Sequence, residues 1–257
     1  MVSNLFDLRG KVALITGSSR GIGRGIAGAM ADHGAAVVIS SRKADACETA
    51  ATEIRNKGGR AEAIPCNVSR PEEREKLLET TMKEWGRIDI LVLNAAANPY
   101  FGPNLEIPDD ALDKIIDVNV KSVLAMCKLV APTMRARRDG AIIIVSSITG
   151  LVGNVNIGAY GLTKAADMQI ARNLACELGP DNIRVNCLAP GVVKTDFSRA
   201  LWEDEAAAKQ VTDRTPLGRL GEVEDIAGAA VYLASKAGAW TTGQTIVIDG
   251  GDTVKGF

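Results

Sequence analysis

KVALITGSSRGIG, residues 11–23, is the stretch that decides the fold of this chain. Residues 11–16 form a short apolar run with several β-branched side chains, which predicts a buried strand. Helical spacing follows over residues 22–32. The turn between them carries three glycines at the spacing G-x-x-x-G-x-G: Gly17, Gly21 and Gly23. Such a turn lets the backbone approach a phosphate whose charge the helix N-terminus stabilises, although a plain turn is the alternative.

Apolar runs alternate with stretches of helical spacing through the rest of the chain. Further strands are expected at residues 36–40, 61–65, 88–93, 141–145, 183–188 and 245–248. Further helices are expected at residues 44–57, 71–85, 109–135, 159–178, 203–213 and 223–235. This alternation predicts βαβ units, and the continuous apolar strands indicate a sheet covered on both faces. We expect one α/β domain over residues 1–257, a Rossmann-like doubly wound parallel sheet of about seven strands, with ligands at the carboxyl ends of the strands.

Composition excludes several classes of protein. The net charge of −1 and the absence of a basic run argue against nucleic acid as a partner. Five scattered cysteines without a CxxC motif argue against a disulfide framework and for a reducing compartment. The one histidine, His33, lies at an expected helix end, so neither a Ser-His-Asp hydrolase nor a histidine-based metal site is expected.

Targeting signals are also missing from the sequence. Residues 1–11 are polar and lack the basic and apolar regions of a signal peptide. No apolar run approaches the ~18 residues that span a bilayer. The chain ends with Lys255-Gly256-Phe257, which differs from the Ser-Lys-Leu type of peroxisomal address. We therefore expect a cytoplasmic protein without a membrane partner.

A tyrosine and a lysine, Tyr160 and Lys164, lie four residues apart in the helix expected at 159–178. This spacing places both on one face of the helix. A nearby cation favours the phenolate and lowers the pKa of a tyrosine from its usual value near ~10, toward the range useful for proton transfer. Ordinary surface packing is the alternative for such a pair taken alone.

Two basic residues favour a 2′-phosphate on the cofactor. NAD sites place an acid after the second strand to hold the ribose hydroxyls, but Ser40-Ser41-Arg42-Lys43 contains none. Arg42, joined by Arg20 of the glycine turn, can meet a phosphate with a planar guanidinium. NADP is therefore the expected cofactor, with two solvated arginines as the alternative. Asn67, at the end of the third strand, is expected near the adenine.

The loops after the fourth and fifth strands offer substrate contacts. Asn94-Ala95-Ala96-Ala97 is small enough for a cofactor to approach, and residues 98–102 add aromatic surface at the site entrance. Either packing or substrate contact would explain that surface. Ser147 ends the fifth strand near Tyr160, where its hydroxyl could hold a substrate oxygen as negative charge develops, although it could simply end the strand.

Three further features point to the same edge of the sheet. Asn119 is the only asparagine in the helix expected at 109–135, where asparagine is unfavourable, although a solvent-facing side chain would also explain it. Residues 189–195 break the sixth strand into a loop whose backbone and Thr195 hydroxyl could hold a carboxamide, unless the loop is a plain turn. Residues 197–212, with Trp202, would form a lid over the substrate.

Together these residues resemble the short-chain dehydrogenase/reductase family over nearly the whole chain. The motifs that carry the resemblance are Thr16-Gly17-x-x-x-Gly21-x-Gly23, Asn94-Ala95-Ala96, Asn119, Ser147, Tyr160-x-x-x-Lys164 and Pro190-Gly191 with Thr195. Each is weak alone, but the whole set in this order, on the expected loops, is specific. Two positions depart mildly from the family pattern: Ala96 stands where glycine is usual, and Asn67 where aspartate is common.

The resemblance implies an oxidoreductase that interconverts a carbonyl and a secondary alcohol with hydride from NADP(H). It implies four catalytic residues: Tyr160 as acid or base, Lys164 beside it and on the nicotinamide ribose, Ser147 on the substrate oxygen, and Asn119 supporting a proton-relay water. The cofactor contacts it implies are Gly17, Ser19, Arg20, Gly21, Ile22, Gly23, Arg42, Lys43, Asn67, Val68, Asn94, Ala95, Ala96, Tyr160, Lys164, Pro190, Gly191, Val193 and Thr195. The expected substrate contacts are Ser147, Tyr160, Asn98, Tyr100 and Trp202.

Within the family, residues 94–102 are similar to the peroxisomal NADPH carbonyl reductase/retinol dehydrogenase group, and bacterial 3-oxoacyl-carrier-protein reductases share the overall pattern. A homotetramer packed through the helices at 109–135 and 159–178 and the last strand is implied as well. Besides a 3-oxoacyl-carrier-protein reductase, two alternatives to a carbonyl reductase remain: a sugar or steroid dehydrogenase using NAD, and a nucleotide sensor without catalysis. The missing acid beside Arg42 argues against the first, and the complete set of four catalytic residues argues against the second.

Overall fold

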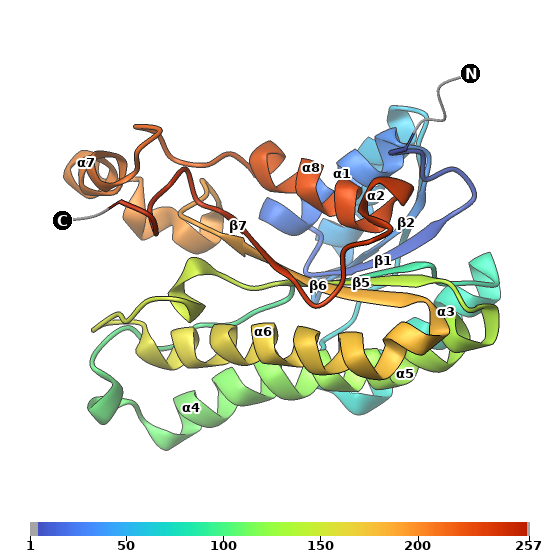
Figure 1. The fold of residues 1–257 in the computed structure, drawn as a ribbon, viewed down its shortest axis with the longest axis horizontal. Coiled ribbons are helices and arrows are strands. Elements are labelled where there is room, and N and C mark those ends of the chain that lie inside the picture. Colours follow the sequence, from blue (N-terminus) through green and yellow to red (C-terminus); the bar gives the residue numbers. More distant parts are fainter. Residues whose placement is uncertain (1–4, 256–257) are drawn as a thin grey trace.

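Seven parallel strands form one sheet at the centre of the molecule (Figure 1). The computed structural model describes residues 5–255, so the two termini on which the cytoplasmic expectation partly depends lie outside the described residues. The strands are β1 (Val12–Thr16), β2 (Ala36–Ser40), β3 (Arg60–Ala63), β4 (Ile90–Leu93), β5 (Gly140–Val145), β6 (Ile183–Pro190) and β7 (Thr245–Ile248). Their order in the sheet is β3-β2-β1-β4-β5-β6-β7. The expected α/β fold with a doubly wound parallel sheet is confirmed.

Helices cover both faces of the sheet. They are α1 (Gly21–Asp32), α2 (Ala44–Asn56), α3 (Pro71–Trp85), α4 (Asp109–Ile116), α5 (Ser122–Arg137), α6 (Gly158–Leu178), α7 (Glu205–Arg214) and α8 (Val223–Ala234). Figure 1 shows α1, α2 and α8 on one face and α3, α5 and α6 on the other. None of these helices, within the part of the chain described, combines the length and apolar character that crossing a membrane requires.

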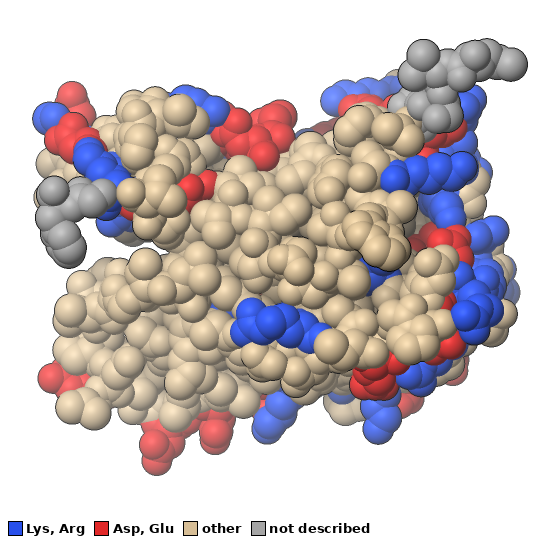
Figure 2. Space-filling view, viewed as in Figure 1, with Lys and Arg blue, Asp and Glu red and all other residues tan. Residues whose placement is uncertain are grey.

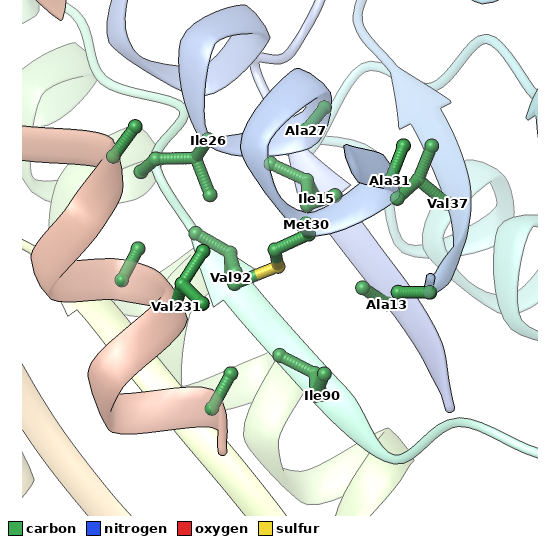
Figure 3. Close-up of a cluster of buried hydrophobic side chains, with 14 of the residues drawn as sticks. Ala13, Ile15, Ile26, Ala27, Met30, Ala31, Val37, Ile90, Val92 and Val231 are labelled. Atoms are coloured by element: carbon green, nitrogen blue, oxygen red, sulfur yellow. The ribbon is translucent and has the colours of Figure 1, made fainter. Parts of the chain in front are cut away.

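Both faces of each central strand are buried, which explains why the strands read as continuous apolar runs. In β1, Ala13 and Ile15 belong to the core under α1 and α8, whereas Leu14 belongs to the core under α3, α5 and α6. Figure 3 shows Ile15, Met30 of α1 and Val231 of α8 converging in the first of these cores. Alternate residues of one strand thus stabilise opposite layers.

The helix expected at residues 109–135 is interrupted by a π-helical turn at Asp117–Lys121, which separates α4 from α5. The expected long helix is therefore present, but with a π-helical turn that the sequence did not predict. The other boundaries agree within two residues. For example, α7 begins at Glu205 rather than 203 because the carboxylate of Asp204 accepts a hydrogen bond from the Ala207 N–H and caps the helix there.

The position of the switch in strand order decides where a ligand can bind. From β1 the chain builds outward through β2 to β3, then returns to place β4 against the other side of β1. Thr16 therefore lies next to Ser40 of β2 and Leu93 of β4. The helices that follow β1 and β4, α1 and α5, lie on opposite faces of the sheet (Figure 1). Open α/β sheets bind ligands in the crevice at such a switch point.

The opposite edge of the sheet is held by a buried carboxylate. Asp89, just before β4, accepts hydrogen bonds from the Val12 N–H at 2.9 Å and from Arg87 at 2.8 and 2.5 Å. Its side chain is 1 % exposed. This pairing ties the starts of β1 and β4 together, far from the crevice at their carboxyl ends.

Candidate active site

The glycine turn after β1 is shaped by close contact with the loop after β4. Gly17 and Gly21 have φ values of +66° and +56°, a region that other residues rarely adopt. A Cβ on Gly23 would lie only 2.5 Å from the Nδ2 atom of Asn94 and 2.5 Å from the Gly17 carbonyl oxygen. Hydrogen is therefore the only side chain that fits at Gly23 without a shift of the surrounding backbone.

Asn94 locks these two loops together. Its Nδ2 donates to the carbonyl oxygens of Thr16 at 3.1 Å and Gly17 at 2.9 Å. In return, the Thr16 Oγ1 accepts the backbone N–H groups of Asn94 and Ala95 at 3.1 and 3.2 Å. Asn94, expected as a cofactor contact, thus uses its amide to shape the glycine turn. Sequence analysis assigned Thr16 no role of its own, because a threonine at a strand end carries no particular signal.

A second link, made by Ser18, joins the glycine turn to β2. Ser18 is fully buried, and its hydroxyl donates to the Ile15 carbonyl and accepts the Ser40 N–H. Sequence reasoning missed this residue as well. The consequence is a turn held in place on both sides, by β2 and by β4.

The N-terminus of α1 is prepared for an anion. The residue before the helix, Arg20, makes no side-chain cap, and the first turn contains no acid. Its backbone N–H groups therefore lack the carboxylate or hydroxyl partners that usually satisfy a helix start. The pyrophosphate of a dinucleotide has the charge and the acceptor oxygens that this end of the helix fits. Of two further expected contacts, Ser19 lies within the turn and Ile22 lies in the first turn of α1.

The two expected phosphate-binding arginines differ in their surroundings. Arg42 is exposed after the end of β2, and within residues 5–255 it has no ion-pair partner. Arg20 instead pairs with Asp196 in the loop after β6, at 3.0 Å. Lys43 follows Arg42 and precedes α2, while Asn67 uses its Oδ1 to accept the Ser69 N–H. Arg42 is therefore the basic residue that a 2′-phosphate could meet without breaking an existing pair.

The Tyr160–Lys164 pair lies at the start of α6, beside the end of β5. The Lys164 side chain is 4 % exposed, and its Nζ lies 5.5 Å from the centre of the Tyr160 ring. The ammonium donates to the Val145 carbonyl at 2.9 Å and to Asp167 Oδ2 at 2.9 Å. The helix thus brings the pair together as expected, and it adds a buried acid that the sequence analysis did not identify.

Burial dominates the acid–base behaviour of this pair. Burial raises the pKa of the Tyr160 phenol above its ordinary value, Lys164 offsets part of that rise, and Asp167 adds to it. Burial alone would lower the pKa of Lys164, but Asp167 and Tyr160 favour the ammonium strongly enough to raise it. The expected lowering of the Tyr160 pKa is therefore wrong in this structure, although Lys164 acts in the expected direction.

Ser147 directly precedes the 3₁₀ turn Ile148–Gly150, which packs on α6, the helix that carries Tyr160. A Cβ on Gly161 would lie 2.6 Å from the Thr149 carbonyl oxygen, which shows how closely the two segments approach. The Ser147 hydroxyl caps the turn by accepting the Thr149 N–H at 3.2 Å. This leaves its own hydrogen free to donate toward the space beside the tyrosine.

Asn119 occupies the π-helical turn and is 1 % exposed. Its Oδ1 accepts the Ala97 N–H at 2.8 Å, and its Nδ2 donates to the Ala97 carbonyl at 3.0 Å and to Thr163 Oγ1 at 3.1 Å. These bonds exclude the solvent-facing alternative. They also tie the loop after β4 to the helix that carries Tyr160 and Lys164.

The loop after β6 completes the crevice. Pro190 ends β6, Val193 is buried, and a Cβ on Gly191 would meet Asp249 at 2.8 Å. Thr195 caps the short helix at residues 196–201, and its methyl group would lie 3.3 Å from a Cβ on Gly21. This loop therefore lies against the glycine turn, as its expected carboxamide contact requires. The remaining expected cofactor contacts, Ala95, Ala96 and Val68, are small or apolar residues on the neighbouring loops.

The side chains expected to contact the substrate differ in whether their polar groups are already hydrogen-bonded. Tyr100 donates its hydroxyl to the Pro103 carbonyl at 3.1 Å, and the Trp202 indole N–H donates to the Thr195 carbonyl at 3.0 Å, so both polar groups are used within their own loops. Asn98 keeps a buried Oδ1 without a hydrogen-bond partner in the described residues. Phe197, which was named only as a lid boundary, packs on Tyr160 with ring centres 5.8 Å apart.

A parallel sheet with a glycine turn at its switch point and a Tyr-Lys pair at the end of β5 is the arrangement of an oxidoreductase. The family model described as enoyl-(acyl carrier protein) reductase matches residues 17–253. The chain belongs to the short-chain dehydrogenase/reductase family. Within residues 5–255, no three His, Cys, Asp or Glu side chains meet in a way that could hold a metal ion.

Curated relatives extend this result over nearly the full length. The protein named dehydrogenase/reductase SDR family member 4 from Oryctolagus cuniculus is 43 % identical over 244 residues, covering 95 % of this chain and 94 % of the relative. The protein of the same name from Caenorhabditis elegans is 42 % identical over 255 residues, covering 98 % of each.

Solved structures agree with the fold. A 7α-hydroxysteroid dehydrogenase complexed with NADH and 7-oxo glycochenodeoxycholic acid has a TM-score of 0.93 at 36 % identity, covering 98 % of this chain and 97 % of the other. A gluconate 5-dehydrogenase from Burkholderia cenocepacia J2315 in complex with NADP and tartrate has a TM-score of 0.94 at 34 % identity, covering 98 % and 99 %.

Proposed function

We propose that this protein is a cytoplasmic, single-domain NADPH-dependent carbonyl reductase in which Tyr160 is the general acid. The observation that carries the proposal is the Lys164 ammonium, held 5.5 Å from the centre of the Tyr160 ring at the end of β5. A sensor of nucleotides has no use for a proton donor with a buried cation beside it. The test is whether NADPH oxidation by a carbonyl substrate is lost when Tyr160 is replaced by phenylalanine.

Each residue of the site has a separate role in the proposed reduction. The nicotinamide, when bound, supplies the hydride. The glycine turn and the N-terminus of α1 hold the pyrophosphate, and Thr195 holds the carboxamide. Ser147 donates a hydrogen bond to the substrate oxygen, which stabilises the negative charge that develops there. Tyr160 donates the proton to that oxygen.

The proton on Tyr160 must then be replaced. Lys164 has three N–H donors, and two of them are used by Val145 and Asp167. The third is available for the nicotinamide ribose or the tyrosine. Asn119 holds Ala97 of the neighbouring loop by two hydrogen bonds and Thr163 of α6 by a third. In the proposed relay this fixed loop supports the water through which Lys164 exchanges protons with solvent.

Arg42 supports a preference for NADPH over NADH. Replacing Arg42 with alanine should raise the KM for NADPH at least tenfold and change the KM for NADH less than twofold, because only NADPH carries the phosphate that pairs with the guanidinium, a charge-assisted contact worth about 1.5–3 kcal/mol. Steady-state kinetics with both cofactors measures the two ratios.

Arg9→Ala is the matched control for this measurement. Arg9 is also an exposed arginine, but it pairs with Asp7 at the other edge of the sheet, before β1. Its removal should leave both KM values unchanged. Equal effects of Arg42→Ala on NADPH and NADH would contradict the assignment of the phosphate to Arg42.

Apolar side chains around the crevice support a hydrophobic carbonyl substrate. Phe101 is 70 % exposed, Val155 75 % and Phe197 57 %. The backbone bond from the Gly102 N–H to the Asn156 carbonyl, at 2.8 Å, holds the first two segments together near Tyr160. A panel of ketones, α-dicarbonyls and β-ketoacyl thioesters, scored by NADPH oxidation, would rank the substrate classes.

We also propose a homotetramer packed through α5, α6 and β7. Each of these elements exposes an apolar side chain: Leu124 is 43 % exposed, Leu162 59 % and Val247 40 %. In Figure 2 the surface over α6 carries few charged residues. Light scattering should give four times the chain mass of 27.0 kDa, and Leu162→Glu should reduce it. Leu105→Glu, at a fully exposed leucine outside these elements, should not. A monomeric wild-type protein would exclude this assembly.

A further inference from the structure

Asp167 is a buried carboxylate that the reaction described above does not use. It lies one helical turn after Lys164, its side chain is 0 % exposed, and its Oδ2 accepts the Lys164 ammonium at 2.9 Å. Its other oxygen, Oδ1, is buried without a hydrogen-bond partner in the described residues. Burying a carboxylate is unfavourable unless it is well paired, so an acid here is not explained by packing.

Among the groups that face Asp167, Lys164 is the cation that is hydrogen-bonded to its carboxylate. From β6, the Cys187 thiol donates to the Asp167 carbonyl oxygen at 3.3 Å, and α5 contributes Cys127. Burial raises the pKa of Cys127 to about 12 and that of Cys187 also well above its usual range, so both thiols are neutral. On α6 itself the other facing group is Tyr160.

The same bond determines where the lysine can act. Two acceptors on different elements, the Val145 carbonyl of β5 and the Asp167 carboxylate of α6, fix the ammonium. A lysine with a single acceptor would keep more of its rotamer freedom. The carboxylate therefore restrains Lys164 and opposes its positive charge at the same time.

We propose that Asp167 is a positioning residue with two effects. It holds Lys164 in place, and its negative charge partly offsets the effect of the Lys164 ammonium on Tyr160, so that the tyrosine stays protonated and can donate its proton. This role rests on the proposed function of Tyr160 as general acid. It favours carbonyl reduction over alcohol oxidation near neutral pH, because reduction consumes the phenol and oxidation consumes the phenolate.

The acidity of Tyr160 supports this assignment. Burial raises its pKa, Lys164 lowers it, and Asp167 raises it again. When the Asp167 charge is removed, the full charge of Lys164 acts on the phenol, and the pKa of Tyr160 must fall. The fall should be about one pH unit, or roughly tenfold in acidity, for the loss of one nearby unit charge at the effective dielectric constant of a protein interior.

The experiment is an NMR titration of protein labelled with carbon-13 at the tyrosine Cζ. The chain has three tyrosines, and Tyr160→Phe assigns the signal of Tyr160. In Asp167→Asn the Tyr160 signal should titrate about one pH unit lower than in the wild type, and in Asp167→Glu it should stay within a few tenths. An unchanged or higher titration point in Asp167→Asn would overturn the proposal.

Asp89→Asn is the matched control, since Asp89 is also a buried and paired carboxylate but lies at the opposite edge of the sheet. It should destabilise the protein without moving the Tyr160 titration. The pH profile of kcat/KM for reduction provides the second readout: its alkaline limb should move to lower pH in Asp167→Asn by the same amount, because activity is lost as the phenol ionises. If the wild type reduces no carbonyl while its Tyr160 signal still responds to Asp167→Asn, the proposed function fails and the role of Asp167 stands.

Discussion

Tyr160→Phe is expected to lower kcat for carbonyl reduction by roughly a thousandfold, within the range measured for loss of a general acid. The substitution removes one hydroxyl and keeps the ring, so the packing against Phe197 at 5.8 Å between ring centres is retained. The affinity for NADPH should change less than twofold, because the phosphates are held by the glycine turn and not by the phenol. A large loss in kcat with unchanged NADPH binding places Tyr160 in the chemical step.

Stopped-flow or steady-state oxidation of NADPH measures the rate, and fluorescence of the bound cofactor measures its affinity. Tyr232→Phe is the control: Tyr232 shares a hydrogen bond of 2.7 Å with Thr241, and it lies in α8, outside the site. This control should lose about 1 kcal/mol of unfolding free energy and keep its turnover. Turnover retained in Tyr160→Phe would remove the tyrosine from the mechanism.

Gly23→Ala should disable cofactor binding. The added Cβ would lie 2.5 Å both from Asn94 Nδ2 and from the Gly17 carbonyl oxygen. Both atoms belong to the hydrogen bond that shapes the turn, so the turn must open to admit the methyl group. We expect the Kd for NADPH to rise at least tenfold and the unfolding free energy to fall by about 1–3 kcal/mol, as for overpacking of a core.

Gly28→Ala is the matched control in the same helix. A Cβ on Gly28 would have no neighbour within 4 Å. Because alanine is the better helix former, this variant should gain about 0.5–1 kcal/mol and bind NADPH normally. Calorimetry and cofactor titration on the two variants separate steric conflict at the turn from a general effect of alanine in α1. Equal NADPH affinities in the two variants would contradict the structural role assigned to Gly23.

The sequence predicted the elements well because their signals are local. Apolar runs such as residues 141–145 and stop signals such as Gly34 lie within the segments that they define. The π-helical turn at Asp117–Lys121 has no such signal. It is associated with the contacts of Asn119 with Ala97 and Thr163, which are 22 and 44 residues away along the chain.

The sequence predicted which residues make up the site, but not all of the contacts between them. Motif spacing identified Tyr160 and Lys164, and the helix does bring them together. Spacing could not show that burial outweighs the lysine in setting the tyrosine pKa, because burial depends on the whole fold. Nor could it show that Asp167 faces inward, since an acid three residues after a lysine on a helix is usually a solvent-exposed pair.

The central place of β1 has a consequence for how the protein is made. Ala13 pairs with Val37 on one side, a contact available once the first forty residues have left the ribosome, and with Ile90 on the other. Until β4 has been synthesised, one apolar edge of β1 stays unpaired, and closing such a distant pairing is slow. An uncovered edge of this kind is where nascent chains associate wrongly. The strand that supports the glycine turn is thus also the part of the N-terminal half that most needs protection during biosynthesis.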